Sequence, residues 1–362
     1  MNMTIKKIFA VMMLILSMGL VSCNSDKDTP SFPDKTTYDM TGFARGADVS
    51  WLTEMEKSGK KFYNADGKEM DCLTLLRDLG VNSVRLRVWV NPTDGWCGKQ
   101  DVLAKALRAK ALGFRIMIDF HYSDTWTDPG SQMKPAAWKS LSFEGLKEAI
   151  ADHTKDVLNA LKADGITPEW IQIGNEVTSG LLWDTDTSTS GATWDAVKDG
   201  VTYKANESNF AAFLNAGSAA ARGVFPKAKI VIHLDGGANA NRTKWIGDIL
   251  QKYAVDYDVL GLSLYPDSDW SGEVTSCIEN MKDIKQNYGK DVMICEVGMP
   301  EDDPATAKAC LTSLMSQSKA LSYCLGVFYW EPECYGGWEN YGLGAFNDNG
   351  QPTAAMDAFA AK

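Results

Sequence analysis

Two stretches of the sequence decide the fold: Ile171–Glu176, which reads IQIGNE, and Val292–Gly298, which reads VMICEVG. Each begins with apolar or strand-favouring residues and then reaches a glutamate, Glu176 in the first and Glu296 in the second. A buried strand that delivers a carboxylate to its own C-terminal end is typical of β/α barrels, which build their active sites at that end. The two stretches therefore predict a barrel that carries two glutamates on different strands.

Strand-like apolar runs alternate with amphipathic helical stretches from residue 41 onward, and this alternation predicts a parallel sheet. We predict strands at Gly42–Val49, Ser83–Val90, Phe114–Phe120, Trp170–Gly174, Lys229–Leu234, Val259–Leu264, Val292–Cys295 and Leu325–Trp330. We predict helices at Asp71–Leu79, Asp101–Leu112, Leu146–Asp164, Asn206–Val224, Thr243–Lys252, Glu273–Tyr288 and Pro304–Leu321. Eight units without a glycine-rich dinucleotide turn favour a closed (β/α)8 TIM barrel over a doubly wound sheet. Since no linker interrupts the pattern, residues 41–362 are predicted to form a single α/β domain.

The N-terminal 40 residues do not share this pattern. Lys6 and Lys7 precede an apolar run at Ile8–Leu20, which has the length of a signal-peptide core and is too short for a comfortable membrane span. Residues 20–23 read LVSC and resemble a bacterial lipoprotein cleavage box. We therefore predict a lipoprotein signal peptide at residues 1–22, lipidation of Cys23 and a flexible tether over residues 23–40. This arrangement predicts an outer-membrane lipoprotein, exposed at the cell surface, that touches the membrane only through its lipid anchor.

Charge and composition narrow the class of partner. The 362-residue chain has a formal net charge of −11, and removing residues 1–22 deletes Lys6 and Lys7 and no acid, which leaves −13. Such an acidic body argues against nucleic acid and would repel a polyanionic glycan, so a neutral polysaccharide fits better. The twelve Trp and twelve Tyr suit a carbohydrate binder, although burial in the core would also account for them.

Seven cysteines remain when Cys23 is set aside, at positions 72, 97, 277, 295, 310, 324 and 334. An odd number leaves at least one thiol unpaired within the chain, and no two form a CxxC motif. Several lie inside helix or strand patterns, where a thiol behaves as a small hydrophobe. We therefore expect few disulfides and no structural zinc.

Polar and aromatic residues gather at the C-terminal ends of the predicted strands, where a barrel places its active site. The candidate substrate-binding residues there are Asp48, Arg85, Arg87, Trp89, Asn91, Asp119, His121, Tyr122, Trp126, Asn175, His233, Tyr265, Trp330 and Trp338. We expect some tryptophans to stack on sugar rings and others to be structural, with Trp89, Trp126, Trp330 and Trp338 in the first group and Trp138, Trp170 and Trp245 in the second.

Glu176 and Glu296 are the candidate catalytic residues. Hydrolysis of a glycosidic bond needs one carboxyl group that protonates the leaving oxygen and a second that acts as nucleophile or base. Opposing strand ends can hold two carboxyl groups roughly 5–5.5 Å apart, as double displacement requires. Asn175 could hydrogen-bond a sugar hydroxyl, and Tyr265 could hold Glu296 in its ionised form. The alternative is that each glutamate is a plain strand-end residue in an ion pair.

Arg85 and Arg87 lie two residues apart on the same side of one strand, so both could point into the barrel. We expect one of them to pair with a carboxylate near the nucleophile and to lower its pKa. The spacing does not indicate which arginine does so, and a structural role is equally open for the other.

A metal centre is the weaker hypothesis. His121 and His233 could be ligands together with Asp119 or Asp235, since barrels do host such sites. Metal-dependent barrel hydrolases usually show His-x-His on an early strand, however, and this chain has Asp119-Phe120-His121 there. We expect no metal ion and no cofactor.

Six motifs of the chain resemble glycoside hydrolase family 53, the arabinogalactan endo-β-1,4-galactanases, and they run in family order from about residue 41 to the C-terminus. They are GADVSW at residues 46–51, RLRVWVNP at 85–92, DFHYSDTWTDPG at 119–130, QIGNE at 172–176, GLSLYP at 261–266 and FYWEP at 328–332. After Glu296 the chain departs from the family, because Val297-Gly298-Met299-Pro300 stands where relatives commonly have Thr and an aromatic residue.

The resemblance implies a retaining hydrolase in which Glu176 is the acid/base and Glu296 the nucleophile. It also implies endo-cleavage of β-1,4-galactan, the neutral side chain of pectin, to galactooligosaccharides. Some bacterial relatives carry a structural calcium in a longer late loop, but residues 300–304 are few, so calcium is not predicted. We expect a monomer. The alternatives are another β-1,4-glycanase, such as a mannanase or xylanase, and a non-catalytic glycan-binding surface lipoprotein.

Overall fold

The computed structural model describes residues 38–183, 197–198, 201–202 and 207–360. The predicted signal peptide, Cys23 and most of the predicted tether lie outside the described residues, so these predictions are not tested. Within the described residues, no helix is both long enough and apolar enough to cross a membrane.

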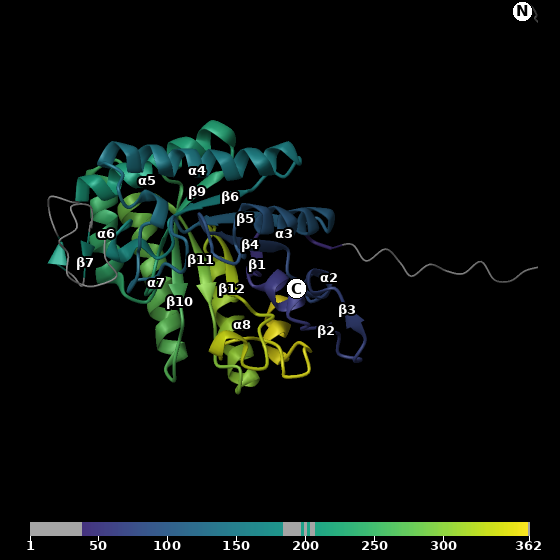
Figure 1. The fold of residues 1–362 in the computed structure, drawn as a ribbon. Coiled ribbons are helices and arrows are strands. Elements are labelled where there is room, and N and C mark those ends of the chain that lie inside the picture. The colour runs from purple at the N-terminus through teal and green to yellow at the C-terminus, as the bar shows by residue number, and fades with distance from the viewer. Residues whose placement is uncertain (1–37, 184–196, 199–200, 203–206, 361–362) are drawn as a thin grey trace, which may run out of the picture. The chain divides into compact units, whose positions relative to one another are not determined.

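Eight parallel strands close into a barrel, which confirms the predicted (β/α)8 fold (Figure 1). In chain order they are β1 (Ala44–Asp48), β4 (Ser83–Val88), β5 (Arg115–Phe120), β6 (Trp170–Ile173), β9 (Lys229–Leu234), β10 (Val259–Leu264), β11 (Asp291–Val297) and β12 (Cys324–Trp330). Each barrel strand pairs with the barrel strand before it and the one after it in the sequence, and β12 pairs with β1 to close the ring. Two small hairpins lie outside the barrel: β2 (Phe62–Tyr63) with β3 (Glu69–Met70), and β7 (Val197–Lys198) with β8 (Val201–Thr202).

Helices surround the barrel (Figure 1). They are α1 (Leu52–Lys57), α2 (Cys72–Asp78), α3 (Lys99–Ala111), α4 (Phe143–Ala163), α5 (Glu207–Val224), α6 (Ala240–Lys252), α7 (Trp270–Tyr288) and α8 (Pro304–Ala320). The described residues also include four short 3₁₀ helices, η1 (Ala136–Trp138), η2 (Val177–Ser179), η3 (Trp338–Asn340) and η4 (Ala354–Phe359). The predicted helices are present, and α1 is an addition that follows β1 almost directly.

Several helices begin earlier than the apolar periodicity predicted, because a capping side chain sets each start. Ser142 accepts the Gly145 N–H at 3.2 Å and starts α4, which had been predicted from Leu146. Asn239 and Asp269 likewise cap α6 and α7, so each helix begins three residues before its first predicted residue. The first turn of each carries at most one large apolar residue, Phe143 in α4 and Trp270 in α7, so apolar spacing alone misses it.

The core has two parts. The larger one fills the space between strands and helices, and a smaller one fills the lower barrel with Ala44, Met117, Trp170, Val231, Val259, Met293, Cys295 and Phe328. Trp170 packs edge-on against Phe328 at 6.0 Å, which confirms its structural role. The cysteines from Cys72 to Cys334 are all buried free thiols in the described part of the chain. Because the smaller core fills this part of the barrel interior, a site is expected at the C-terminal ends of the strands.

Candidate active site

Glu176 is presented by a sharp turn at the end of β6. Gly174 takes φ +79°, and a Cβ there would lie only 2.4 Å from the Val177 side chain, so glycine is required. Glu176 itself has φ 46° and ψ 49°, a left-handed conformation that is costly for a residue with a side chain. The turn lifts the Glu176 carboxyl group above the barrel, and strain of this kind is typical of functional sites.

Glu296 reaches the barrel interior because β11 contains a bulge. Leu262 pairs with Ile294, but the next residue of β10, Ser263, pairs with Glu296, so Cys295 is the extra residue. In a regular strand Cys295 and Glu296 would face opposite sides of the sheet. Cys295 belongs to the barrel-interior core, and the bulge turns Glu296 to the same side.

Arg85 is the charged centre beneath the site and is almost completely buried. Its Nη1 lies 2.7 Å from Asp48 Oδ2 and 2.9 Å from Glu296 Oε1, and its Nη2 lies 2.8 Å from Asp119 Oδ2. It also donates to Asn175 Oδ1 at 2.8 Å. The spacing of Arg85 and Arg87 had left open which of them contacts Glu296, and in the structure it is Arg85.

The two glutamates differ in their surroundings, and this separates their pKa values. Burial, followed by the negative charge of Glu296, raises the pKa of Glu176 well above its ordinary value. Burial also raises the pKa of Glu296, but Arg85 and the Tyr265 hydroxyl, which donates to Oε2 at 2.7 Å, oppose that rise. Glu296 therefore loses its proton first, and Glu176 retains one. Two carboxyl groups whose pKa values differ in this way are suited to act as nucleophile and as acid.

A hydrogen-bonded chain leads from Glu176 to Asn175 through Ser263 and His233. Glu176 Oε1 lies 2.6 Å from Ser263 Oγ, which lies 2.9 Å from His233 Nε2, and His233 Nδ1 lies 2.9 Å from Asn175 Oδ1. When Glu176 is ionised, Ser263 donates to it and His233 Nε2 donates to Ser263, while His233 Nδ1 accepts from the Gln172 amide at 3.2 Å and makes no hydrogen bond to Asn175. When Glu176 is protonated, the direction can reverse and Nδ1–H can donate to Asn175. The chain can thus accommodate both protonation states of Glu176.

Both buried histidines serve as hydrogen-bonding groups. His121 Nε2 contacts Asp119 Oδ2 at 3.0 Å, and its Nδ1 contacts the Thr127 hydroxyl at 2.9 Å. Burial lowers the pKa of both His121 and His233, so each ring is neutral near pH 7. No group of three or more His, Cys, Asp or Glu among the described residues could hold a metal ion.

Aromatic side chains form one wall of a cavity of about 630 Å³ that both glutamates line. The predicted residues that line it are Trp89, His121, Trp126, Asn175, Tyr265 and Trp330, together with Glu176 and Glu296. Trp51, which was not among the predicted binding residues, packs between Trp126 at 5.3 Å and Trp330 at 5.1 Å. Planar faces around a polar floor are suited to stacking on sugar rings.

Arg87 supports this wall from below. Its guanidinium lies 4.0 Å from the centre of the Trp126 ring, and its Nη1 lies 3.1 Å from Glu331 Oε1. Glu331 also accepts the Trp51 N–H at 3.0 Å, and burial raises its pKa to about 7. Arg87 and Glu331 therefore hold the tryptophans in place and lie behind the cavity surface.

Of the remaining predicted residues, three are buried below the cavity, and two do not line it, so their predicted contact with substrate is corrected. Asp48, Asp119 and His233 lie below the cavity in the network described above. Tyr122 was predicted to bind substrate, but it has φ 53°, is fully buried and hydrogen-bonds Thr154 of α4 at 2.8 Å, so it belongs to the outer core. Trp338 packs on that core in η3 and does not line the cavity, whereas its neighbour Glu339 does.

Asn91 is exposed and is not among the residues that line the cavity. Two residues that prediction missed, Gln172 and Ser263, contact the catalytic network directly. Gln172 accepts from Arg85 Nε at 3.1 Å and donates to Asp119 at 2.6 Å. Both lie at inward-facing positions of strands that had been predicted, so alternation along β6 and β10 could have found them.

Two glutamates at the ends of the fourth and seventh barrel strands, in a cavity walled by tryptophan, define a barrel-type glycoside hydrolase. The chain belongs to glycosyl hydrolase family 53, whose family model matches residues 44–359.

Relatives that are named as galactanases are identical to this chain at about a third of the aligned residues. The chain is 33% identical over 321 residues to an endo-β-1,4-galactanase of Bacillus subtilis, covering 80% of this chain and 70% of that one. It is 30% identical over 344 residues to an arabinogalactan endo-β-1,4-galactanase of Thermothelomyces thermophilus, covering 87% and 98%.

Solved structures of family 53 proteins and galactanases have the same fold as this chain. A fungal β-1,4-galactanase superposes with a TM-score of 0.77 at 29% identity, covering 88% of this chain and 99% of that one. The family 53 catalytic domain of Ignisphaera aggregans gives 0.76 at 28% identity, covering 92% and 98%. A xylanase of Thermotoga maritima, 14% identical with a TM-score of 0.58, shares the fold alone.

Proposed function

We propose that this protein is an endo-β-1,4-galactanase that hydrolyses galactan with retention, with Glu296 as nucleophile and Glu176 as acid/base. The observation that carries the proposal is the asymmetry of the pair: Glu296 is bound by Arg85, whereas the carboxyl group of Glu176 meets Ser263 and has no cationic partner among the described residues. The family and the names of its galactanase relatives support the choice of substrate.

In the first step, a Glu296 oxygen attacks the anomeric carbon while the carboxyl group of Glu176 gives its proton to the glycosidic oxygen. The bond to the leaving sugar breaks and a glycosyl ester on Glu296 forms. In the second step, Glu176, now a carboxylate, takes a proton from water, which attacks the same carbon and releases Glu296. Two inversions give net retention of the β-configuration.

The partners of the two glutamates support this direction of proton transfer. Arg85 and Tyr265 both stabilise the Glu296 carboxylate. When the second step releases this carboxylate from the ester, the same two partners stabilise it again. Once the glycosyl ester forms, Glu296 no longer bears a negative charge. Since that charge raises the pKa of Glu176, the pKa falls as the ester forms, and Glu176 then stays ionised, the form that can take a proton from water in the second step.

The test is proton NMR of the anomeric signals while the purified protein (residues 24–362) digests linear β-1,4-galactan. We expect β-anomeric reducing ends to appear first and then to mutarotate. Initial α-anomers would refute double displacement. Release of reducing sugar from mannan or xylan but not from galactan would favour another β-1,4-glycanase. Binding of galactan without any new reducing ends would favour the glycan-binding lipoprotein.

We also propose that the protein is lipidated at Cys23 and tethered at the cell surface, on the evidence of the N-terminal sequence alone. Metabolic labelling of expressing cells with an alkyne-bearing palmitate should label the wild-type protein and leave the Cys23→Ser variant unlabelled. External protease should release the galactanase activity from intact cells. A wild-type protein that is secreted unlabelled would indicate an ordinary cleaved signal peptide instead.

A further inference from the structure

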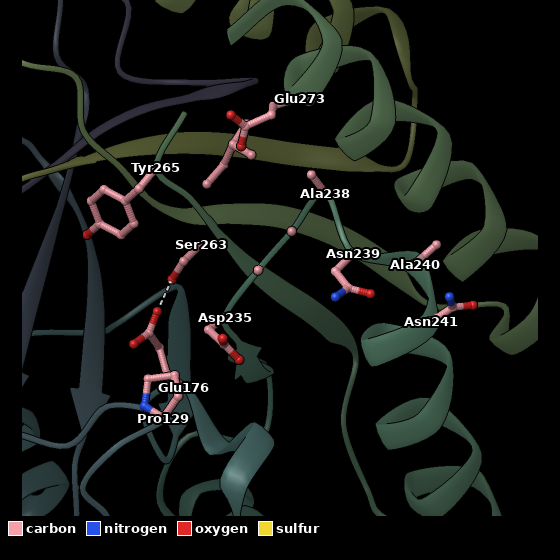
Figure 2. Close-up of a pocket in the computed structure, with 13 residues that line it drawn as sticks. Pro129, Glu176, Asp235, Ala238, Asn239, Ala240, Asn241, Ser263, Tyr265 and Glu273 are labelled. Atoms are coloured by element: carbon pink, nitrogen blue, oxygen red, sulfur yellow. Dashed lines mark hydrogen bonds between the residues drawn. The ribbon is translucent and has the colours of Figure 1, made fainter. Parts of the chain in front are cut away.

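A second hollow, of about 740 Å³, adjoins the aromatic cavity at Glu176 and Tyr265, which line both. It is also lined by the loop after β9, the start of α6, the end of β10 and the start of α7. The polar residues among these are Asp235, Asn239, Asn241, Ser263 and Glu273, and the apolar ones include Ala238 and Leu264. Figure 2 shows Tyr265, Ser263 and Glu176 on one side of this hollow, Asn239 and Asn241 on the other, and Asp235 between them. In contrast to the aromatic cavity, this hollow has no tryptophan among the described residues that line it.

The two hollows share Glu176 and differ at Glu296, and the inference drawn from this rests on the proposed function. Glu296 lines only the aromatic cavity, so the sugar whose anomeric carbon it attacks lies there. Glu176 protonates the oxygen on the far side of that carbon. A chain that continues beyond this oxygen passes Glu176 and enters the second hollow, which is therefore the place of the leaving sugar.

Asp235 carries an unused acceptor in this hollow. It directly follows β9, its side chain is 13% exposed, and one carboxylate oxygen, Oδ2, is bound by Arg242 Nη1. The other oxygen, Oδ1, is buried and has no hydrogen-bond partner within the described residues. A buried carboxylate oxygen without a partner is unfavourable, so a donor from a ligand would be strongly bound there.

The wall that bears Asp235 is fixed relative to the acid/base. The Gly237 N–H donates to Ser263 O at 2.7 Å, and a Cβ at Gly237 would lie 2.8 Å from that oxygen, so only glycine allows this approach. Asn239 Oδ1 accepts the Arg242 N–H at 3.1 Å and caps α6, which bears Arg242. Since Ser263 also bonds Glu176, Asp235 and Glu176 are held in one rigid unit.

We propose that Asp235, oriented by Arg242, binds the leaving galactosyl unit by accepting a hydrogen bond from one of its hydroxyls through Oδ1. The same contact would bind an acceptor sugar. In transfer, the acceptor hydroxyl attacks the anomeric carbon of the glycosyl ester, its proton passes to Glu176, the ester bond to Glu296 breaks and a new glycosidic bond forms. Water follows the same route in hydrolysis.

The measurement is the ratio of transfer to hydrolysis. Asp235 also contributes to the raised pKa of Glu176, so a loss of rate alone would not separate sugar binding from tuning of the acid. Both branches start from the same ester and use the same base, so a change in Glu176 cancels in their ratio. The donor is linear β-1,4-galactan, the acceptor is ¹³C-labelled β-1,4-galactobiose, and initial rates of labelled transfer product and of new reducing ends are compared.

We expect Asp235→Ala to lower this ratio about ten-fold or more, the loss expected for a hydrogen bond to a charged acceptor. Asp235→Asn keeps the shape of the side chain and a neutral acceptor, so it should lower the ratio by a smaller factor and guards against a folding defect. The matched control is Asp66→Ala, which removes an exposed aspartate from the turn between β2 and β3 and should leave the ratio unchanged.

An unchanged ratio in both Asp235 variants would overturn the inference, as would a wild-type enzyme that cleaves galactan but transfers none of it to galactobiose at high acceptor concentration. A wild-type protein that releases no reducing ends from galactan would refute the proposed function instead, and the inference with it. The two failures are therefore distinguishable in a single set of assays.

Discussion

Glu296→Ala should abolish turnover of galactan and of every aryl galactoside, with a loss in kcat on the order of 10⁵-fold or more, as for other enzymes that lose their nucleophile. Without the carboxylate no glycosyl ester can form, and a good leaving group does not compensate. The variant should nevertheless fold. Arg85 retains Asp48 and Asp119 as partners, and removing a third acid from one guanidinium relieves repulsion among the carboxylates.

The measurement pairs initial rates on galactan and on 4-nitrophenyl β-1,4-galactotrioside with the melting temperature of the variant. Glu148→Ala, which removes an exposed glutamate from α4, is the matched control and should retain full activity. We expect the Glu296→Ala variant to melt at the wild-type temperature or above it. Residual turnover within 100-fold of wild type, with the fold intact, would show that Glu296 is not the nucleophile.

Glu176→Ala should impair activity according to the leaving group. On galactan the loss should be about 10²- to 10⁴-fold, the usual contribution of a general acid, because a sugar alkoxide leaves poorly without a proton. On an activated aryl galactotrioside kcat/KM should fall less than about ten-fold, since the phenolate needs little protonation. The glycosyl ester should then accumulate, because water attacks slowly without its base.

Three readouts follow from this. Aryl galactoside should give a burst of phenolate, and azide, an anion that needs no base, should restore turnover and form a β-galactosyl azide. The pH profile should also change. The active form of Glu176 is protonated, so wild-type activity on galactan falls as the pH rises through the raised pKa of Glu176, and the variant should lose this limb. Equal losses for the Glu176 and Glu296 variants on the aryl substrate would contradict the assignment.

The sequence predicted the barrel and the region of the site because both depend on local signals. Alternating apolar periods identify strands and helices, and a polar residue after a buried parallel strand must lie at one end of the barrel. This reasoning grouped Glu176, Asn175, Trp89 and Trp126, and in the structure all four line one cavity. It failed for Tyr122 and Trp338, because position after a strand does not tell which way the backbone turns. At Tyr122 a positive φ directs the ring toward α4.

The tertiary structure alone decided how the two glutamates work together. Strict alternation would have turned Glu296 away from the barrel, and the bulge that brings it inside depends on pairing with β10, a strand distant in sequence. Likewise, Arg85 rather than Arg87 meets Glu296 because of which acids surround each guanidinium. The unpaired oxygen of Asp235 also appears only when Arg242 and the loop after β9 are in place. Local periodicity fixes where a strand ends, whereas pKa values and free acceptors depend on neighbours that the chain brings together only by folding.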